Sequence, residues 1–286
     1  MDITDRQKEL LNAVQWSFPM VKRPYLALAE KFGITEETVI EELRTVKELG
    51  ILRQLSAIFD TRALGYLSAL VAAKVPDEKI DEAAQIINAH PGVSHNYKRN
   101  NDYNLWYTIA VPPGQTLEAH VNMLHDMSGS LVTRKLPTLK LYKIGVKLDM
   151  TGKAKPDDKS EVLPHEKPKR EAVMEVPEFS EKELAIIREV QEDLPLVSKP
   201  FAAIAVEAQC SEDDVMDALN EFKEKKYMRR FAAVMNHRHA GYKANAMGVW
   251  AVPEEDCEEI GPKMAGFSAV SHCYKRPTYD DWPYSI

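Results

Sequence analysis

Two short segments of the chain carry the same chemically active side chains. Gly-Val-Ser-His-Asn-Tyr-Lys-Arg occupies 92–99, and Ala-Val-Ser-His-Cys-Tyr-Lys-Arg occupies 269–276. Each segment holds one imidazole, one phenol and two cations. An imidazole donates protons or binds metals and a fixed guanidinium binds carboxylates, so the combination suits an anionic, metal-containing ligand. The alternative is that two homologous strands kept a shared surface pattern.

Strand alternation predicts which of these side chains act together. Side chains two residues apart in an extended strand point to the same face. The imidazole, phenol and arginine of each segment therefore share a face, and they are His95, Tyr97, Arg99, His272, Tyr274 and Arg276. We expect the imidazoles and phenols to be catalytic and the arginines to hold carboxylates at two points. Lys98 and Lys275, on the opposite strand face, are weaker candidates for binding the same ligand.

The repeat extends through most of the chain. Gly65-Tyr66 recurs as Gly241-Tyr242 at an offset of 176 residues, and from Val75-Pro76 and Val252-Pro253 onward the offset is 177. Residues 152–178 lie between the copies, are rich in Lys, Glu and Asp, and have no apolar periodicity. This composition predicts a linker between two duplicated modules.

Each copy reads as a helical head followed by an α/β body. In the first head, helices are predicted after the Thr4 cap, from Tyr25 to Gly33, and from the Thr35 cap to Gly50, before a strand over 51–59. This order is that of a winged helix-turn-helix. The elements predicted for the body are a strand over 66–75, a helix over 77–89, a hairpin of 92–99 and 103–111, a helix around 115–127 and a strand near 137–148. The resulting βαββαβ order is the ferredoxin-like topology.

The fold class is therefore α+β, with two homologous modules. The predicted domains are a head over 1–58, a body over 59–151, the linker over 152–178, a second head over 179–234 and a second body over 235–286. At the offset of 177, Ile286 aligns with Ile109, so the second body is expected to lack its last helix and strand. We expect the copies to pair inside the chain through their bodies, and further self-association is left open.

Composition limits the class of protein. A chain of 286 residues with 28% charged and 44% hydrophobic residues is typical of a soluble protein with two domains. The three cysteines lack metal-ligand spacing and the N-terminus has no signal-peptide character, which favours a cytoplasmic protein. No apolar run is long enough to cross a bilayer. A net charge of −7 argues against a protein that binds nucleic acid strongly.

The order of elements resembles the Lrp/AsnC family of transcription regulators, in which the third helix enters DNA and the second domain senses amino acids. The chain departs from that family where DNA would be touched. Residues 35–50 hold five acidic side chains against Arg44 and Lys47, and residues 211–226 hold six against three lysines. Such acids repel phosphates, so we expect no specific binding of nucleic acid. A ligand-sensing regulator remains the alternative function.

A closer resemblance is to the sirohaem decarboxylase family, which is built on the same regulator architecture. The segments that carry it are Ser-His-Asn-Tyr-Lys-Arg-Asn-Asn-Asp-Tyr-Asn-Leu-Trp-Tyr-Thr at 94–108, Ser-His-Cys-Tyr-Lys-Arg-Pro-Thr-Tyr-Asp-Asp-Trp-Pro-Tyr at 271–284 and Phe-Asp-Thr-Arg-Ala-Leu-Gly-Tyr at 59–66. The resemblance implies conversion of the C12 and C18 acetates of sirohaem to methyl groups, giving didecarboxysirohaem on an alternative route to haem or haem d1. In this family two related subunits associate, and here they look fused. A haem-binding sensor without catalysis is a third hypothesis.

The chemistry of that reaction fits the residues. When CO2 leaves, the conjugated macrocycle accepts the electron density, so no protein-bound cofactor is required and the iron belongs to the tetrapyrrole substrate. We expect His272 to deliver the proton or to ligate the substrate iron, and we favour the second copy because His237 and His239 add imidazoles there. Further candidates for substrate contact are Arg53, Arg229, Arg230 and Trp282. Exposed wing arginines and a plain core tryptophan are the alternatives for these four.

Overall fold

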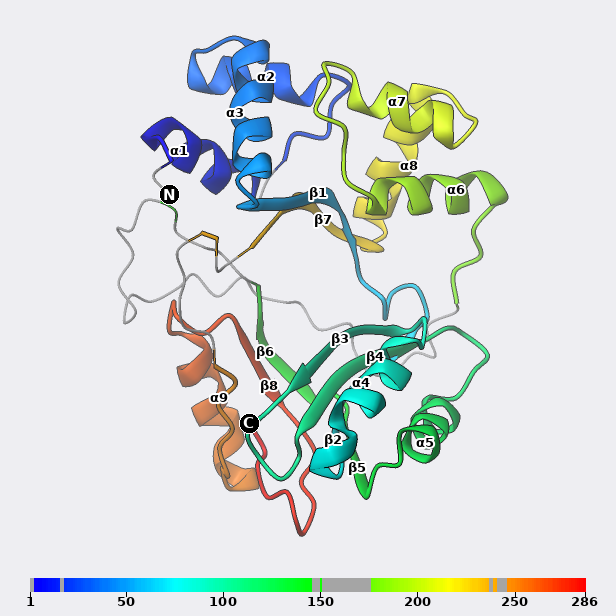
Figure 1. The fold of residues 1–286 in the computed structure, drawn as a ribbon. Coiled ribbons are helices and arrows are strands. Elements are labelled where there is room, and N and C mark those ends of the chain that lie inside the picture. The colour runs from blue at the N-terminus through cyan, green and yellow to red at the C-terminus, as the bar shows by residue number, and fades with distance from the viewer. Residues whose placement is uncertain (1–2, 16–17, 146–149, 151–175, 237–238, 241–245) are drawn as a thin grey trace. The chain divides into compact units, whose positions relative to one another are not determined.

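The structure, a computed structural model, describes residues 3–15, 18–145, 150, 176–236, 239–240 and 246–286. The chain divides into two compact units (Figure 1). Unit 1 comprises Met1–Asp60, Gly145–Asp158 and Glu178–Met247, and unit 2 comprises Thr61–Ile144, Lys159–Pro177 and Gly248–Ile286. Unit 1 thus contains the two helical heads and unit 2 the two bodies. Most of the predicted linker and His237 lie outside the described residues, and the predicted domain boundaries stay predictions.

The first head contains the helices that the sequence predicts. Helix α1 (Asp5–Val14) begins at Thr4, whose hydroxyl accepts the Gln7 N–H in a capping box. Helix α2 (Pro24–Phe32) ends at Gly33, which has the left-handed φ of 64° that favours glycine. Helix α3 (Glu36–Glu48) begins at the Thr35 cap, and strand β1 (Leu52–Phe59) follows. The capping residues thus mark the helix starts that the sequence predicted.

The second head repeats the first and pairs with it. Its elements are α6 (Glu181–Gln191), α7 (Pro200–Glu207), α8 (Glu212–Glu224) and strand β7 (Met228–Met235). Strands β1 and β7 are antiparallel, and Ser56 lies opposite Ala232, its own equivalent at the offset of 176. Such self-complementary pairing is what a twofold relation between two equal copies produces. One hydrophobic core, with residues from both heads, lies beneath the strands.

The body of the first copy has the ferredoxin-like topology. Its strands are β2 (Leu67–Lys74), β3 (Val93–Lys98), β4 (Leu105–Val111) and β5 (Val132–Leu136), all antiparallel in the order β3-β4-β2-β5. The turn η1 (Asp77–Lys79) leads into α4 (Ile80–Asn88), and α5 (Leu117–Ser128) follows β4. Both helices cover one face of the sheet (Figure 1), where Ala83, Ile87, Val121 and Leu124 pack on buried strand residues. The predicted βαββαβ order is confirmed.

The prediction of a closing strand near 137–148 was wrong. The strand that closes the sheet is β5, which ends before Pro137, since proline has no N–H for a ladder. The following strand β6 (Lys140–Ile144) instead pairs with β8 (His272–Lys275) of the second copy. The first copy therefore supplies β6 as the antiparallel neighbour of β8 in the second.

One side chain-to-backbone contact occurs in the same form in each of the two bodies. In the first copy the Asn104 side chain accepts the Val75 N–H at 2.9 Å and donates to the Val75 carbonyl at 2.7 Å. In the second copy the Ser285 hydroxyl accepts the Val252 N–H at 3.1 Å and donates to the Val252 carbonyl at 2.7 Å. Since Val252 is the equivalent of Val75, Ser285 is the equivalent of Asn104. The other elements described in this body are the 3-10 helix η2 (Glu254–Asp256) and helix α9 (Cys257–Ala265).

This contact corrects the alignment of the two copies. The Arg99 N–H donates to the Asn104 carbonyl and the Arg276 N–H to the Ser285 carbonyl, both at 2.8 Å. Four residues (100–103) separate the first pair and eight (277–284) separate the second. Ile286 is consequently the equivalent of Leu105 and not of Ile109. Among the described residues, no helix is long and apolar enough to cross a membrane.

Candidate active site

The repeated strands β3 and β8 present their rings in line. The ring centroids of His95 and Tyr97 are 6.1 Å apart, and the same distance separates His272 from Tyr274. The two tyrosine rings are each covered by the arginine two residues further on, with Cζ 4.7 Å from the centroid for Arg99 and 4.4 Å for Arg276. Both imidazoles are exposed. Each strand therefore forms a ladder of imidazole, phenol and guanidinium, as the alternation predicts.

The serine before each histidine fixes the ring. Ser94 Oγ lies 3.0 Å from His95 Nδ1, and Ser271 Oγ lies 3.0 Å from His272 Nδ1. With Nδ1 engaged by its neighbour, Nε2 is the ring nitrogen suited to proton transfer or to an iron ion. The two copies are alike at this point.

The first ladder lies on the face of the sheet away from α4 and α5. Tyr97 stands opposite Trp106 on β4, and Trp106 belongs to the hydrophobic cluster on that face. Asn96 points the other way, and its amide donates to the Ala84 carbonyl of α4 at 3.4 Å. Cys273, at the equivalent position of the second copy, is likewise buried against α9, with Sγ 3.7 Å from the Gly261 carbonyl. Cys273 is thus a small core residue.

Arg276 is a desolvated cation held by the first copy. Its Nη1 donates to the Leu136 carbonyl at 2.7 Å and to Thr138 Oγ1 at 2.8 Å. Burial, together with a smaller effect of the nearby charge of Arg62, lowers the pKa of Arg276 to about 10. In the described part of the chain, Arg276 forms no ion pair with a carboxylate. A largely desolvated cation without a counter-ion is costly, so the position suits an anionic ligand.

Arg99 has different surroundings. Its Nη1 donates to the Lys98 carbonyl at 3.2 Å, and the side chain borders a polar pocket of about 510 Å³. The pocket is lined by Asp77, Ile80, Lys98, Arg99, Asn100, Asn101 and Asn104. Lys98 is exposed at its rim, whereas Lys275 is held in an ion pair with Glu254 that raises its pKa. Lys98 is therefore better suited than Lys275 to meet a ligand.

Four of the candidate residues lie in unit 1. Arg53 is exposed on β1, and the Arg229 guanidinium forms an ion pair with Asp60 at 2.9 Å. Burial lowers the pKa of Arg230, and the neighbouring charge of Arg229 adds to the effect. The Nδ1–H of His239 donates to the Gly50 carbonyl at 3.0 Å. Since His272 belongs to unit 2, the idea that these side chains join one site with it stays a prediction.

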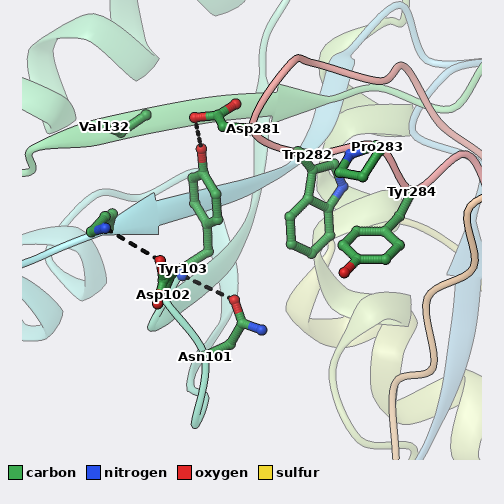
Figure 2. A pocket seen from close by; sticks show the side chains of 9 residues that line it. Asn101, Asp102, Tyr103, Val132, Asp281, Trp282, Pro283 and Tyr284 are labelled. Carbon is green, nitrogen blue, oxygen red and sulfur yellow. Dashed lines mark hydrogen bonds and ion pairs between the residues drawn. The ribbon is translucent and has the colours of Figure 1, made fainter.

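Trp282 is buried in unit 2 and packs on other aromatic rings. Its ring centroid lies 5.4 Å from Tyr103, 5.1 Å from Trp106 and 4.8 Å from Tyr284. Figure 2 shows Trp282 and Tyr284 on one side of a pocket of about 320 Å³ and Asn101 and Tyr103 on the other. The expected contact with a macrocycle stays a prediction, and the structure assigns Trp282 a packing role.

Sequence reasoning missed the partners of Arg276. Leu136 and Thr138 come from the first copy, and their contacts cannot be seen in a local pattern. One signal was present: the segment after Arg276 is longer than the segment after Arg99, which an alignment without gaps hides. Among the described residues, no cluster of three or more His, Cys, Asp or Glu side chains could hold a metal ion.

Two family models match the chain, each of them twice. The model described as "Siroheme decarboxylase NirDL-like HTH domain" matches residues 7–53 and 183–229. The model described as "AsnC-like ligand binding domain" matches residues 63–143 and 239–286. The matched ranges cover a head and a body in each copy.

Characterised proteins resemble the whole chain or one half of it. A siroheme decarboxylase of Hydrogenobacter thermophilus is 40% identical over 279 residues, which is 97% of this chain and 80% of the relative. A siroheme decarboxylase alpha subunit of Desulfovibrio desulfuricans is 40% identical over 150 residues, 52% of this chain and 85% of the subunit. The crystal structure of the siroheme decarboxylase NirDL in complex with an iron-uroporphyrin III analogue superposes with a TM-score of 0.73 at 34% identity, covering 99% of this chain and 80% of that one.

Proposed function

The chain belongs to the sirohaem decarboxylase family, and from this premise we propose that it removes CO2 from the C12 and C18 acetates of sirohaem, with the His272 ladder as the reacting centre. The product is didecarboxysirohaem, an intermediate on an alternative route to haem or haem d1. The enzyme is a carboxy-lyase, and the regulator hypothesis is not favoured by the relatives that match the full chain.

The observation that carries the assignment is the desolvated guanidinium of Arg276. It has two hydrogen-bond acceptors from the first copy but no carboxylate partner among the described residues. Sirohaem has eight carboxylates, so one of them supplies the missing charge. A guanidinium holds a carboxylate at two points and fixes its orientation, which an ammonium group cannot do.

The chemical step needs one proton and no redox partner. The bond between the acetate methylene and its carboxylate breaks, CO2 leaves, and the electron pair stays with the ring-attached carbon. The conjugated macrocycle delocalises that pair, so we propose that no protein-bound cofactor takes part. His272 Nε2 then delivers a proton to the carbon, which becomes a methyl group.

Tyr274 lies between the imidazole and the guanidinium of its ladder. Its ring contacts both His272 and Arg276, so it holds the two groups at a fixed separation. If His272 instead ligates the substrate iron, the same spacing determines where the macrocycle lies relative to Arg276. Measurements on a His272 variant distinguish the two roles of the imidazole. Loss of an axial iron ligand changes the visible spectrum, and loss of a proton donor changes the rate.

Turnover tests the proposal directly. Sirohaem is incubated with the protein without oxygen, and the tetrapyrrole is analysed by mass spectrometry. Loss of one and then two molecules of CO2 is the expected result. An unchanged tetrapyrrole that remains bound to the protein would establish the non-catalytic haem-binding hypothesis instead.

The helical heads supply a second test. Helices α3 and α8 begin with acidic side chains, and Glu36 on α3 is buried in an ion pair with Arg23. Acids at this end of a helix repel phosphates. We therefore expect only weak, non-specific DNA retention at low salt, measured by fluorescence anisotropy. Tight, sequence-selective binding at physiological salt would restore the regulator hypothesis.

A further inference from the structure

The eight-residue loop 277–284 of the second copy is fastened to the sheet of the first. Asp281 receives two hydrogen bonds from the Arg134 guanidinium, from Nε at 3.0 Å and from Nη2 at 2.9 Å. The Tyr103 hydroxyl donates to the same carboxylate at 2.7 Å, as Figure 2 shows. A bidentate pair with a third donor is a strong and directional contact. We call Asp281, Arg134 and Tyr103 the clasp.

The rest of the loop supports the clasp. Tyr279 and Trp282 exchange backbone hydrogen bonds at 2.8 and 2.9 Å, which closes the loop into a tight turn. The Tyr279 hydroxyl donates to the Lys135 carbonyl at 2.6 Å, and its ring lies 5.0 Å below Arg134 Cζ. Trp282 is buried beneath the turn. The loop therefore contacts two consecutive residues of β5, Arg134 and Lys135.

The residues that hold Arg276 come from the same stretch of chain. Arg134 and Lys135 contact the loop, Leu136 offers its carbonyl to Arg276, and Thr138 offers its hydroxyl. The loop itself starts directly after Arg276, and the Arg276 N–H donates to the Ser285 carbonyl at its far end. Fixing the loop on β5 thus fixes both the arginine and its acceptors.

We propose that Asp281 is a positioning residue, which through the clasp holds the end of β5 so that Leu136 and Thr138 aim the Arg276 guanidinium at a substrate carboxylate. The inference rests on the proposed function for its substrate. Asp281 acts through Arg276 and does not itself touch the substrate. The first copy has only four residues at this place, and their one carboxylate, Asp102, pairs with Lys74 of β2 in its own body at 3.4 Å, so the contact with β5 is specific to the second ladder.

Asp281 stays ionised across the working pH range, so the hydrogen bonds of the clasp do not change with pH. Hydrogen bonds from Arg134 and Tyr103 lower the pKa of Asp281 to about 2. The carboxylate is therefore charged at every pH at which the enzyme is assayed, and the clasp does not act as a pH switch. Its effect is one of geometry, and a misplaced reacting group can lower a rate by orders of magnitude.

A double-mutant cycle tests the proposal. Asp281→Asn is made alone and together with Arg276→Lys, and kcat/KM for sirohaem is measured for all four forms. We expect Asp281→Asn to lower kcat/KM about tenfold in the wild-type background and less than about twofold when Arg276 is already changed. A role in general stability predicts that the two losses multiply in full, which would overturn the inference.

Asp280→Asn is the matched control. Asp280 is the neighbouring exposed carboxylate and forms no hydrogen bond or ion pair in the part of the chain that the structure describes, so kcat/KM should stay within about twofold. Arg134→Gln breaks the clasp from its other side and must reproduce Asp281→Asn. If Asp281→Asn fails to fold, Tyr279→Phe, which removes one hydroxyl contact, takes its place in the cycle.

The binding readout separates this inference from the proposed function. Sirohaem affinity is measured by absorbance titration for the same four forms. If the wild type binds sirohaem without releasing CO2, the decarboxylase proposal fails, while non-additive losses in affinity still support the positioning of Arg276. If losses in affinity and rate are both additive, the positioning role fails even though decarboxylation stands.

Discussion

The two ladders are nearly identical in sequence, yet the loops that follow them give their arginines different environments. The loop 100–103 is short, and the Arg99 guanidinium bonds to its neighbour's carbonyl beside an open polar pocket. The loop 277–284 is twice as long, and Arg276 is desolvated and held by Leu136 and Thr138. A duplicated motif can thus be specialised by a neighbouring segment that carries none of the motif's own residues.

A second difference concerns the lysines of the motifs. Glu254 neutralises Lys275 on the second copy, whereas Lys98 is exposed at the rim of the first pocket. The first motif thus presents two cations, Lys98 and Arg99, at the polar pocket, whereas the second presents one desolvated cation, Arg276. An accessible site favours loose binding of a polyanion, and a desolvated guanidinium favours orientation of one carboxylate. We therefore expect the second ladder to carry the chemistry.

The largest expected effect comes from removing the imidazoles one at a time. His272→Ala should lower kcat by about 100-fold or more if the ring is the general acid, because proton donation typically contributes that much. His95→Ala should lower kcat by less than about tenfold if the first ladder mainly binds. Both variants are assayed by CO2 release from sirohaem, and visible spectra are recorded in parallel. An unaltered rate accompanied by a changed spectrum assigns His272 to the iron.

His95→Ala and His272→Ala can be compared directly, because the two imidazoles have similar environments. His95 and His272 are both exposed, and each is bonded to the serine before it, so the two changes remove the same group from similar surroundings. Equal losses in the two variants would show that both ladders react and would remove the proposed specialisation. Wild-type turnover in both would end the proposal that the ladders form the active site.

A smaller effect is expected from exchanging the arginines for lysine. Arg276→Lys keeps the charge but loses the two-point geometry and the stacking on Tyr274, so kcat/KM should fall about tenfold or more. Arg99→Lys should cost less than about threefold, because an ammonium serves nearly as well in an accessible polar pocket. Steady-state kinetics with sirohaem measure both. A larger loss for Arg99→Lys than for Arg276→Lys would reverse the assignment of the two ladders.

Local signals in the sequence account for the parts of the fold that were predicted well. Thr4 and Thr35 mark helix starts because a capping side chain satisfies N–H groups within three residues. The alternation that places His95, Tyr97 and Arg99 on one face is also a local property. The strand β5 was missed because its polar residues Thr133, Arg134 and Lys135 hide the apolar pattern.

Contacts between the copies account for what the sequence could not reveal. The acceptors of Arg276 are 140 and 138 residues away along the chain, and no local pattern specifies them. The pairing of β6 with β8 depends on the same long-range arrangement. Long-range contacts also explain why some candidates look less like ligand-binding residues in the structure. Arg229 in unit 1 forms an ion pair with Asp60, since a basic residue on a strand often has a structural partner.

The smallest expected effect concerns an imidazole pair that the first body has and the second lacks. The Gly92 N–H donates to His90 Nδ1 at 3.0 Å, so the His90 Nε2–H donates to His120 Nδ1 at 2.8 Å. The His120 Nε2–H in turn donates to Gln115 Oε1 at 2.6 Å. The position equivalent to His90 in the second copy is Phe267. The entry to β3 is held in this way only while His90 is neutral, because its Nδ1 must accept the Gly92 N–H.

Burial and the neighbouring His120 lower the pKa of His90 below its ordinary value of 6.5. The unfolded chain therefore takes up a proton at the His90 imidazole more readily than the folded chain does. The contribution of His90 to the free energy of unfolding is fully present above about pH 6.5 and is lost as the pH drops below that value. His90→Phe, which copies the second body, should make the melting temperature less dependent on pH between about 7.5 and 5.5, by a few degrees. His125→Gln is the control, because that ring bonds to Thr133 and not to a second imidazole. Equal pH dependence in the wild type and His90→Phe would show that the pair does not couple protonation to folding, and the two bodies would then differ in their ladders and loops alone.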